Sequence, residues 1–512
     1  MFDQHSNHSG MSIKIFSVCI LFILGAALAA VAELPYGGWI QIPILSLLWW
    51  RLDQKSISFK KQFVLGLSFG IAYFVVGLWW LYISLHDVGG MSAPLACMGV
   101  FLLSAYVALY FSLATLAIPM FKQNRLFGLL LAASWVLAEF LRGYIFTGFP
   151  WMGFAETQFN GPFAPVAPFF GGLACTFLAV WTSWEIYQAR KHIVSSTLLI
   201  LAVIGISQSA GLFTFTKPVG ELISVRLIQG NFEQSLKFNP QAISKQIDFY
   251  AGEITKEAAN LIIIPETAFP WPLPNLPIGL LNYLQNFSNT SSSNILLGLI
   301  GEVPGEGGMQ YSNRATGLSP NALPYQYDKA HLVPFGEFIP LGFQWFVKAF
   351  HVPMSDFARG KLDQPPFVIV RKDQEDLHAA ITICYEDVFG GELASRIQQS
   401  NQPVNLLINM TNLAWFGDSQ ASTQQLRLSQ LRSLETGLPA LRATNTGITA
   451  VLGPDGKVLK DLPEFTQTTL GTHVQAYSGK TPYVIWGNLP ILGISCLLLL
   501  WGLIQRRRFR HF

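Results

Sequence analysis

Residues 378–386, HAAITICYE, contain a short apolar run typical of a β-strand, and this run ends at Cys384. Tyr385, Glu386 and Asp387 follow the cysteine directly, so the thiol stands where a strand meets a polar loop. In open α/β sheets, ligands bind at this carboxyl end of the strands. Alone, the stretch also fits a buried core cysteine beside acidic loop residues. The choice between the two interpretations depends on the rest of the chain.

The other four cysteines lie in long apolar runs, where a thiol usually behaves as a small buried hydrophobe. They are Cys19, Cys97, Cys175 and Cys496. Cys384 therefore has no second cysteine nearby in the sequence with which to form a disulfide.

The composition of the 512 residues indicates a membrane protein. Hydrophobic residues make up 51% and charged residues 12%, whereas soluble proteins carry about 25% charged residues. The apolar excess lies in residues 1–216 and in 484–512, which combine an apolar segment with a basic tail. Residues 217–483 resemble a soluble domain. The formal net charge of +3 is too small to indicate a nucleic-acid partner.

Eight apolar segments are close to the roughly 20 residues that a bilayer-spanning helix needs. They are residues 12–32, 36–50, 62–83, 92–120, 127–142, 164–186, 193–215 and 484–504. Lys and Arg cluster in the loops on one side of these segments, and basic residues are retained in the cytoplasm. We therefore expect both termini in the cytoplasm and residues 217–483 outside it. The first segment also resembles a cleavable secretory signal, whose removal would not change this orientation.

The loop of residues 142–154, RGYIFTGFPWMGF, is rich in aromatic residues and glycine. Such a segment fits an aromatic belt at the membrane surface. A role in shaping an entrance for lipid is the alternative interpretation, and it includes Arg142.

Short β-type runs alternate with helical stretches between residues 222 and 453, a pattern typical of a sheet with helices packed on its faces. The runs are LISVRLIQ, LIIIP, ILLGLI, FVIV, HAAITI, VNLLIN and GITAVLG, and the helical stretches include residues 241–258 and 419–434. Two further sites place ionisable residues at strand ends or in apolar surroundings: Glu266 follows LIIIP, and Lys329 and Glu337 lie in YDKAHLVPFGEFIP.

These residue types are suited to acyl transfer. A neutral thiol such as that of Cys384 is a weak nucleophile with a reference pKa near 8.5, so a carboxylate such as Glu266 must remove its proton. The Lys329 ammonium can stabilise the oxyanion of the tetrahedral intermediate. Glu337 can keep Lys329 charged and fixed while Glu266 remains free to exchange protons.

With these motifs the chain resembles the carbon–nitrogen hydrolase (nitrilase) superfamily and, within it, the apolipoprotein N-acyltransferase family. The resemblance rests on RGYIFTGFPW, IQGNFEQSLKF, IIPETAFPW, YDKAHLVPFGEFIP, ICYEDVF, AWFGDS and RATNTGITAVLGPDG. It implies an α-β-β-α sandwich with a Glu–Lys–Cys triad at strand ends, beside an α-helical membrane domain.

By matching motifs, the resemblance implies that Glu266 is the general base, Lys329 the catalytic lysine and Cys384 the nucleophile. Glu337, Tyr385 and Glu386 take supporting positions. Substrate-binding positions fall on Phe238, Trp415 and Arg142. Two residues depart from the family pattern: Phe238 stands where the family often has Trp, and Leu413 where it commonly has Asp.

The resemblance further implies a bacterial inner-membrane enzyme with a periplasmic catalytic domain, active as a monomer and without a cofactor or metal. Its acyl donor would be a phospholipid, typically phosphatidylethanolamine. Its acceptor would be the N-terminal amine of a diacylglyceryl-cysteine apolipoprotein. A thioester on Cys384 would link the two half-reactions.

Two apolar stretches near the predicted site, residues 269–277 and 343–354, fit lids that admit acyl chains, with packing in the core as the alternative. A membrane-tethered amidase with the same triad is the alternative function, in which water attacks the acyl-enzyme. A transporter is disfavoured because the apolar segments contain few charged residues, mainly Glu139 and Glu185.

Overall fold

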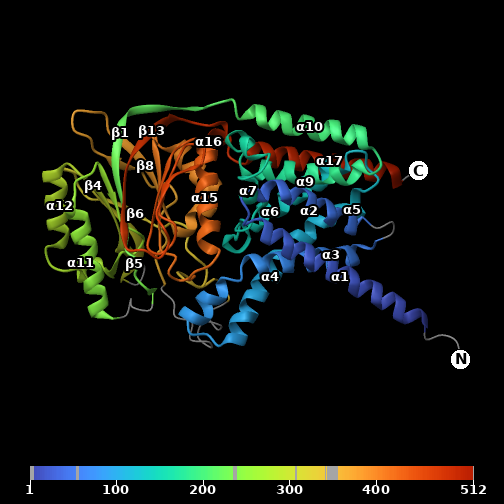
Figure 1. Cartoon of the computed structure of the whole chain (residues 1–512), viewed down its shortest axis with the longest axis horizontal. Coiled ribbons are helices and arrows are strands. Elements are labelled where there is room, and N and C mark those ends of the chain that lie inside the picture. The colour runs from blue at the N-terminus through green and yellow to red at the C-terminus, as the bar shows by residue number, and fades with distance from the viewer. Residues whose placement is uncertain are drawn as a thin grey trace. The chain divides into compact units, whose positions relative to one another are not determined.

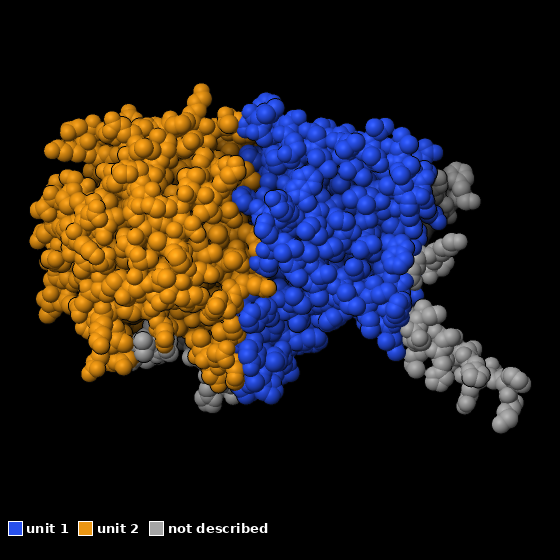
Figure 2. All heavy atoms as spheres, viewed as in Figure 1, with its two compact units in different colours: residues 1–82, 92–213, 486–512 blue, residues 83–91, 214–485 orange. Residues whose placement is uncertain are grey.

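The computed structural model describes residues 5–53, 57–234, 239–305, 308–340, 342 and 356–510, without the side chains of residues 5–14 and 508–510. These residues form two compact units (Figure 2). The helical unit contains residues up to Tyr82, Ser92–Phe213 and the residues from Trp486 onward, and the sheet unit contains Ile83–Met91 and Thr214–Ile485.

The helical unit is built from the apolar segments of the sequence. Its helices are α1 (His5–Val31), α2 (Gly37–Leu52), α3 (Phe59–Gly77), α4 (Ala93–Thr115), α5 (Ala117–Phe121), α6 (Phe127–Arg142), α7 (Phe154–Gln158), α8 (Ala167–Phe170), α9 (Gly172–Ala189), α10 (Ile193–Ala210) and α17 (Leu489–Arg510). Aromatic rings fill its centre: the Trp135 ring lies 4.6 Å from that of Phe111 and 5.1 Å from that of Phe154.

Four helices of the described chain are long and apolar enough to cross a bilayer: Phe59–Gly77, Ala93–Phe121, Ile193–Ala210 and Leu489–Arg507. Leucines and isoleucines on α10, such as Leu201 and Ile206, are largely exposed, as expected of a surface that faces lipid. The helices in the other four predicted segments, α1, α2, α6 and α9, are shorter or less apolar. Eight spans therefore remain a prediction.

The predicted span of residues 62–83 differs from the structure at its end. Helix α3 stops at Gly77, and a short π-helix, η1 (Ile83–Val88), follows a turn. The segment Ile83–Met91 belongs to the sheet unit, where the side chain of Ile83 packs against Gly417. Hydropathy alone did not separate this segment from the helix, because residues 79–83, WWLYI, continue the apolar run.

Two stacked sheets form the centre of the sheet unit. The first has the order β13-β1-β2-β4-β5-β6, with β3 paired to β4, and the second has the order β12-β11-β10-β9-β8-β7. The strands are β1 (Thr216–Gln229), β2 (Leu261–Ile263), β3 (Phe269–Pro272), β4 (Asn294–Gly305), β5 (Gly308–Leu318), β6 (Tyr325–Asp328), β7 (Phe367–Ile369), β8 (Leu377–Ile383), β9 (Leu406–Thr411), β10 (Ala440–Thr444), β11 (Ala450–Leu452), β12 (Val458–Asp461) and β13 (Thr468–Gly479).

Alternation along the strands separates the core into layers. In β2, Leu261 and Ile263 belong to the core between the two sheets, whereas Ile262 packs with the helices on the outer face. This follows from the period of two residues in a strand. Helices α11 (Pro240–Lys256) and α12 (Leu280–Ser291) cover one face, and α14 (Gly390–Gln399) and α15 (Ala421–Thr436) cover the other (Figure 1). The predicted α-β-β-α sandwich is confirmed.

All seven predicted β-type runs contain a strand, and the helical stretches 241–258 and 419–434 coincide with α11 and α15. Within residues 269–277, Phe269 is fully buried and Leu276 is 8% exposed, so these two residues pack in the core, as the core alternative predicts, whereas residues 274, 275 and 277 are exposed. The other predicted lid, residues 343–354, lies outside the described residues.

Candidate active site

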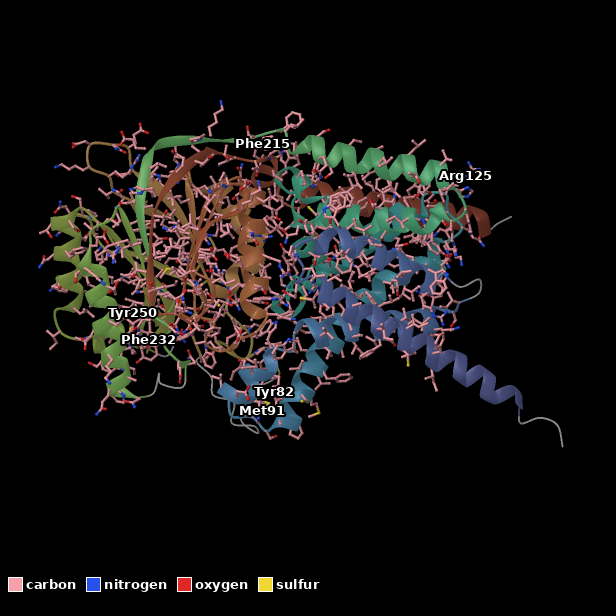
Figure 3. The ribbon with its side chains drawn as sticks, viewed as in Figure 1. Tyr82, Met91, Arg125, Phe215, Phe232 and Tyr250 are labelled. Carbon is pink, nitrogen blue, oxygen red and sulfur yellow. The ribbon has the colours of Figure 1, made fainter. Side chains whose placement is uncertain are left out.

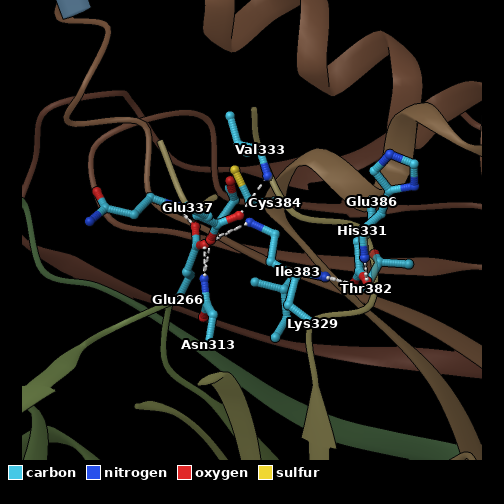
Figure 4. A network of polar contacts seen from close by, with 12 residues as sticks. Glu266, Asn313, Lys329, His331, Val333, Glu337, Thr382, Ile383, Cys384 and Glu386 are labelled. Carbon is cyan, nitrogen blue, oxygen red and sulfur yellow. Dashed lines mark hydrogen bonds and ion pairs between the residues drawn. The ribbon is translucent and has the colours of Figure 1, made fainter. Parts of the chain in front are cut away.

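The three predicted catalytic residues come together at the ends of three strands of the two sheets (Figure 4). Glu266 follows β2, Lys329 follows β6, and Cys384 follows β8. The strands end at the same edge of the sandwich, which is why residues more than 100 positions apart in sequence share one site.

Lys329 is held between two carboxylates. Its side chain is 1% exposed, and its Nζ lies 2.9 Å from Oε1 of Glu337 and 3.3 Å from Oε1 of Glu266. Burial lowers the pKa of Lys329, but Glu266, Glu337 and Cys384 outweigh this effect and raise it above its usual value. The ammonium is therefore charged throughout the physiological range, as an oxyanion partner must be.

Asn313 also joins the two carboxylates, and the sequence analysis did not identify it. Its Nδ2 donates to Oε1 of Glu266 at 2.7 Å and to Oε1 of Glu337 at 2.8 Å. The backbone N–H of Lys329 donates to the carbonyl of Asn313 at 2.8 Å. Asn313 lies on β5, where its buried amide stands beside Ser312 and Arg314; this polar triplet within a strand was the available signal.

The second oxygen of Glu266 is fixed by a different loop. The backbone N–H of Asn412 donates to its Oε2 at 2.9 Å. The Asn412 side chain is held in turn by the amide groups of Gln234 and Asn445, at 3.2 and 3.1 Å. Hydrogen-bond donors therefore orient both oxygens of the Glu266 carboxylate, the predicted base.

Cys384 has a strained backbone. Its φ of 51° lies in the left-handed region, which costs a residue with a Cβ roughly 1–2 kcal/mol. Its carbonyl accepts a hydrogen bond from Nε2 of Gln425 at 3.0 Å, and the same amide lies 4.0 Å from the thiol. This contact fixes the turn that follows β8 and presents the thiol.

Burial raises the pKa of the Cys384 thiol to about 12, and the negative charge of Glu266 contributes further to this rise, while Lys329 opposes it. The cysteine is therefore a neutral thiol at rest, not a thiolate. Its proton must leave as the nucleophile attacks, which requires a base within reach.

A buried hydrogen-bond network supports the turn at Cys384. Nη2 of Arg442 donates to Oε1 of Gln425 at 2.9 Å, and its Nη1 donates to Oγ of Ser429 at 3.1 Å. Ser429 also donates to Asp387, which accepts from Thr382 at 2.6 Å. Burial lowers the pKa of Arg442 to about 10, despite the neighbouring Asp387. The network connects α15 and β10 to the cysteine turn.

Glu386 is a positioning residue in this structure. Its Oε1 accepts from the backbone N–H groups of Ala330 at 2.7 Å and His331 at 3.1 Å, and its Oε2 accepts from that of Ile383 at 2.7 Å. The hydroxyl of Tyr327 donates to both oxygens. Burial raises the pKa of Glu386, but all these partners are donors to its carboxylate. Glu386 therefore ties the loop of Lys329 to the strand of Cys384.

Tyr385 packs in an aromatic group. It is 5% exposed, and its ring lies 5.2 Å from that of Phe389 and 5.9 Å from that of His331. His331 stacks on Phe389 and its Nδ1 lies 3.2 Å from Glu392. The predicted supporting position of Tyr385 is thus one of packing beside the nucleophile.

The three predicted substrate-binding residues are not gathered at the triad by any described contact. Phe238 lies outside the described residues. Trp415 is half-buried in the turn after β9. Arg142 belongs to the helical unit, is fully buried, and donates to the carbonyls of Phe149, Pro150 and Trp151. Its described contacts fix the loop of residues 143–153, and substrate binding by these residues stays a prediction.

Leu413, which replaces the Asp common in the family, is 3% exposed and packs against Gly447. An apolar contact therefore occupies this position. The rings of Phe232, which follows β1, and of Tyr250 on α11 lie 5.7 Å apart and connect the end of this strand to the helix (both are labelled in Figure 3).

The Glu–Lys–Cys geometry on two stacked sheets defines a carbon–nitrogen hydrolase domain, and the family model described as carbon-nitrogen hydrolase matches residues 224–483. A second family model, the apolipoprotein N-acyltransferase N-terminal domain, matches residues 25–184.

Related proteins cover nearly the whole chain. The apolipoprotein N-acyltransferase of Ralstonia nicotianae is 40% identical over 480 residues, which cover 90% of each chain. That of Nitrosomonas europaea is 35% identical and covers 96% of each chain. The chain belongs to the apolipoprotein N-acyltransferase family. A solved carbon–nitrogen hydrolase superfamily protein from Xanthomonas campestris covers 50% of this chain and 91% of its own, with a TM-score of 0.35 and 16% identity.

Proposed function

We propose that this protein transfers an acyl chain from a membrane phospholipid to the N-terminal amine of diacylglyceryl-cysteine apolipoproteins, through a thioester on Cys384. The observation that carries the proposal is the arrangement of a neutral thiol, a lysine held between two carboxylates, and an oriented carboxylate base at one sheet edge. Membership of the apolipoprotein N-acyltransferase family and the apolar helices support a lipid substrate.

In the first half-reaction, Glu266 takes the proton of the Cys384 thiol as the sulfur attacks the sn-1 ester carbon. Lys329 stabilises the oxyanion of the tetrahedral intermediate. When the ester C–O bond breaks, Glu266 returns the proton to the leaving glycerol oxygen, and a lysophospholipid departs. The acyl chain remains on sulfur as a thioester. Phosphatidylethanolamine is the donor expected from the family.

In the second half-reaction, the α-amine of the lipoprotein attacks the thioester carbon. Glu266 takes a proton from the amine, Lys329 again stabilises the oxyanion, and the C–S bond breaks. The thiolate leaves and regains a proton from Glu266. An amide is formed, and the free thiol is restored for the next donor.

The proposal includes a topology. A catalytic domain of residues 217–483 would lie in the periplasm, carried by the membrane domain of residues 1–216 and the segment 484–512. Both termini would be cytoplasmic, and about eight helices would cross the inner membrane. The basic loops described above support this orientation. We expect the protein to act as a monomer, because the triad comes from one chain.

A two-substrate assay tests the proposal. The full-length protein in detergent micelles is incubated with phosphatidylethanolamine labelled in its sn-1 chain and a synthetic diacylglyceryl-cysteine peptide. Labelled N-acyl peptide is the expected product. Labelled free fatty acid as the sole product would show that water is the acceptor, and the chain would then be a membrane-tethered amidase or lipase-like hydrolase.

A further inference from the structure

A short strap, residues 357–360, connects the backbones of Lys329 and Glu337. The N–H of Phe357 donates to the carbonyl of Glu337 at 2.9 Å, and the N–H of Gly360 donates to the carbonyl of Lys329 at 2.9 Å. Between them, the N–H of Ala358 donates to the backbone carbonyl of Tyr311 at 2.7 Å. The strap is thus fixed at three points around the site, and Arg359 lies within it.

Gly360 fits only as glycine in this strap. A Cβ at this position would lie 2.0 Å from the carbonyl oxygen of Asp328, well inside contact distance. The close approach keeps the strap against the strand end that carries Lys329. Arg359 is therefore held between two fixed residues. Gly360, the next residue, hydrogen-bonds to Lys329, and Phe357, two residues before it, hydrogen-bonds to Glu337.

Arg359 is exposed. Its guanidinium lies 5.3 Å from the ring centre of Phe338, the residue that follows Glu337. Among the described residues, no carboxylate lies within ion-pair distance of it. Other arginines of the sheet unit differ: Arg314 is paired with Asp328, and Arg442 is buried in its network.

The Lys329 ammonium is not available to an anionic lipid. Lys329 is already bracketed by Glu266 and Glu337, and it is 1% exposed. A phospholipid whose sn-1 ester reaches Cys384 carries its phosphodiester only a glycerol unit away. That anion therefore reaches the rim of the site, where an exposed guanidinium can bind two phosphate oxygens with its planar fork. Phe335, 36% exposed beside Phe338, offers apolar surface next to it.

We infer that Arg359 binds the phosphodiester of the acyl donor and sets the preference of this site for phospholipids over uncharged acyl esters. The inference rests on the proposed function, because it assigns a residue to the donor of the first half-reaction. The ligand of Arg359 is thus the phosphate diester of a lipid. Arg359 does not contact the headgroup beyond this phosphate.

The test measures acylation of Cys384 by intact-protein mass spectrometry at increasing mole fractions of donor in neutral detergent micelles. The donors are phosphatidylethanolamine and a diacylglycerol with the same chains. We expect Arg359→Gln to raise the half-saturating fraction of phosphatidylethanolamine about tenfold, as loss of one charged hydrogen-bonding group does, with the maximal rate nearly unchanged. Reaction with diacylglycerol should not change. The half-saturating fraction of phosphatidylethanolamine for Arg359→Lys should lie between those of the wild type and Arg359→Gln.

Lys361→Gln is the matched control, because Lys361 is an exposed cation two residues along the same segment. An equal effect of Lys361→Gln would show general surface electrostatics and overturn the inference. So would an unchanged half-saturating fraction in Arg359→Gln, or a fall in its maximal rate alone, since a structural role predicts the latter. Inhibition by inorganic phosphate that disappears in Arg359→Gln, without any effect on the lipid, would assign the residue to free phosphate instead.

Failure of the proposed function gives a different result. In that case the wild-type chain forms no adduct with any phospholipid, and no variant of Arg359 is needed to show it.

Discussion

Cys384 combines a half-buried position at the sheet edge with a thiol that is neutral at rest. Its raised pKa means that thiolate is scarce at neutral pH, so reactivity depends on transfer of the proton to Glu266 during attack. The strained φ and the Gln425 contact hold the sulfur at the end of β8 whether or not it is ionised. Protection from unwanted alkylation or oxidation follows from the same feature, since the thiolate is the reactive species.

This state predicts the pH dependence of alkylation. With the pKa of Cys384 raised to about 12, the thiolate fraction grows tenfold for each pH unit below that value. Alkylation by iodoacetamide, followed on the Cys384 peptide by mass spectrometry, should therefore rise steadily from pH 7 to pH 10 without a plateau. Because Glu266 raises this pKa, Glu266→Gln should speed alkylation at fixed pH while abolishing acyl transfer. A plateau below pH 8 would contradict this description of the thiol.

Asn313 predicts an effect on the rate of acylation. Its Nδ2 donates to both Glu266 and Glu337, so Asn313→Ala removes two hydrogen bonds to charged groups and should slow Cys384 acylation about 10- to 100-fold. The control is Gln326→Ala, an exposed position on the neighbouring strand β6. An acylation rate in Asn313→Ala equal to that of the wild type would mean that Asn313 does not hold the two carboxylates in place.

At the scale of elements, the site depends on which strand ends meet at one edge. The sequence placed Glu266 and Cys384 after apolar runs, and this is enough to predict their meeting in a two-sheet fold. It did not predict Asn313, because β5 reaches the site through its antiparallel register with β4 and β6, which no local pattern reveals. Gln425 on α15 and Arg442 on β10 were also missed. A polar residue on a helix such as α15 is usually interpreted as solvent-facing, which explains the omission of Gln425.

Glu386 links two of these elements, and its removal should loosen both. Glu386→Gln replaces one acceptor oxygen with an amide that faces N–H donors, leaving buried groups unsatisfied. We expect the sheet unit to lose about 2–4 kcal/mol of stability and its unfolding temperature to fall by about 5–10 °C, measured by thermal unfolding in detergent. Glu392→Gln, whose side chain is 28% exposed, is the control. An unchanged unfolding temperature would remove the linking role of Glu386.

At the scale of the whole molecule, composition divides the chain into an apolar part and a soluble-like part. The sandwich was predictable because its strands follow period-two alternation and its helices separate them. The end of the third apolar segment was not, because residues 78–85 stay apolar after α3 has ended. Hydropathy measures the environment of a segment and does not say which unit it joins. The polar strand β13, with its threonines and glycines, was missed for the opposite reason.

The orientation gives a whole-molecule prediction. A cysteine placed at Leu323, 91% exposed on the sheet unit, should react with a membrane-impermeant maleimide in cells whose outer membrane has been made permeable. A cysteine at Arg125, in the exposed turn before α6, should react only after the inner membrane is disrupted. Both are made in a chain that lacks its native cysteines. The reverse pattern would place the sheet unit in the cytoplasm and exclude the proposed substrates.

The central claim is that one acyl chain rests on Cys384 between donor and acceptor, and intact-protein mass spectrometry tests it directly. After incubation with phosphatidylethanolamine, the wild-type chain should gain the mass of one acyl group, and addition of a diacylglyceryl-cysteine peptide should remove it as N-acyl peptide. Cys384→Ala should gain nothing. An adduct that forms in Cys384→Ala, or one that the peptide amine cannot remove, would contradict the account.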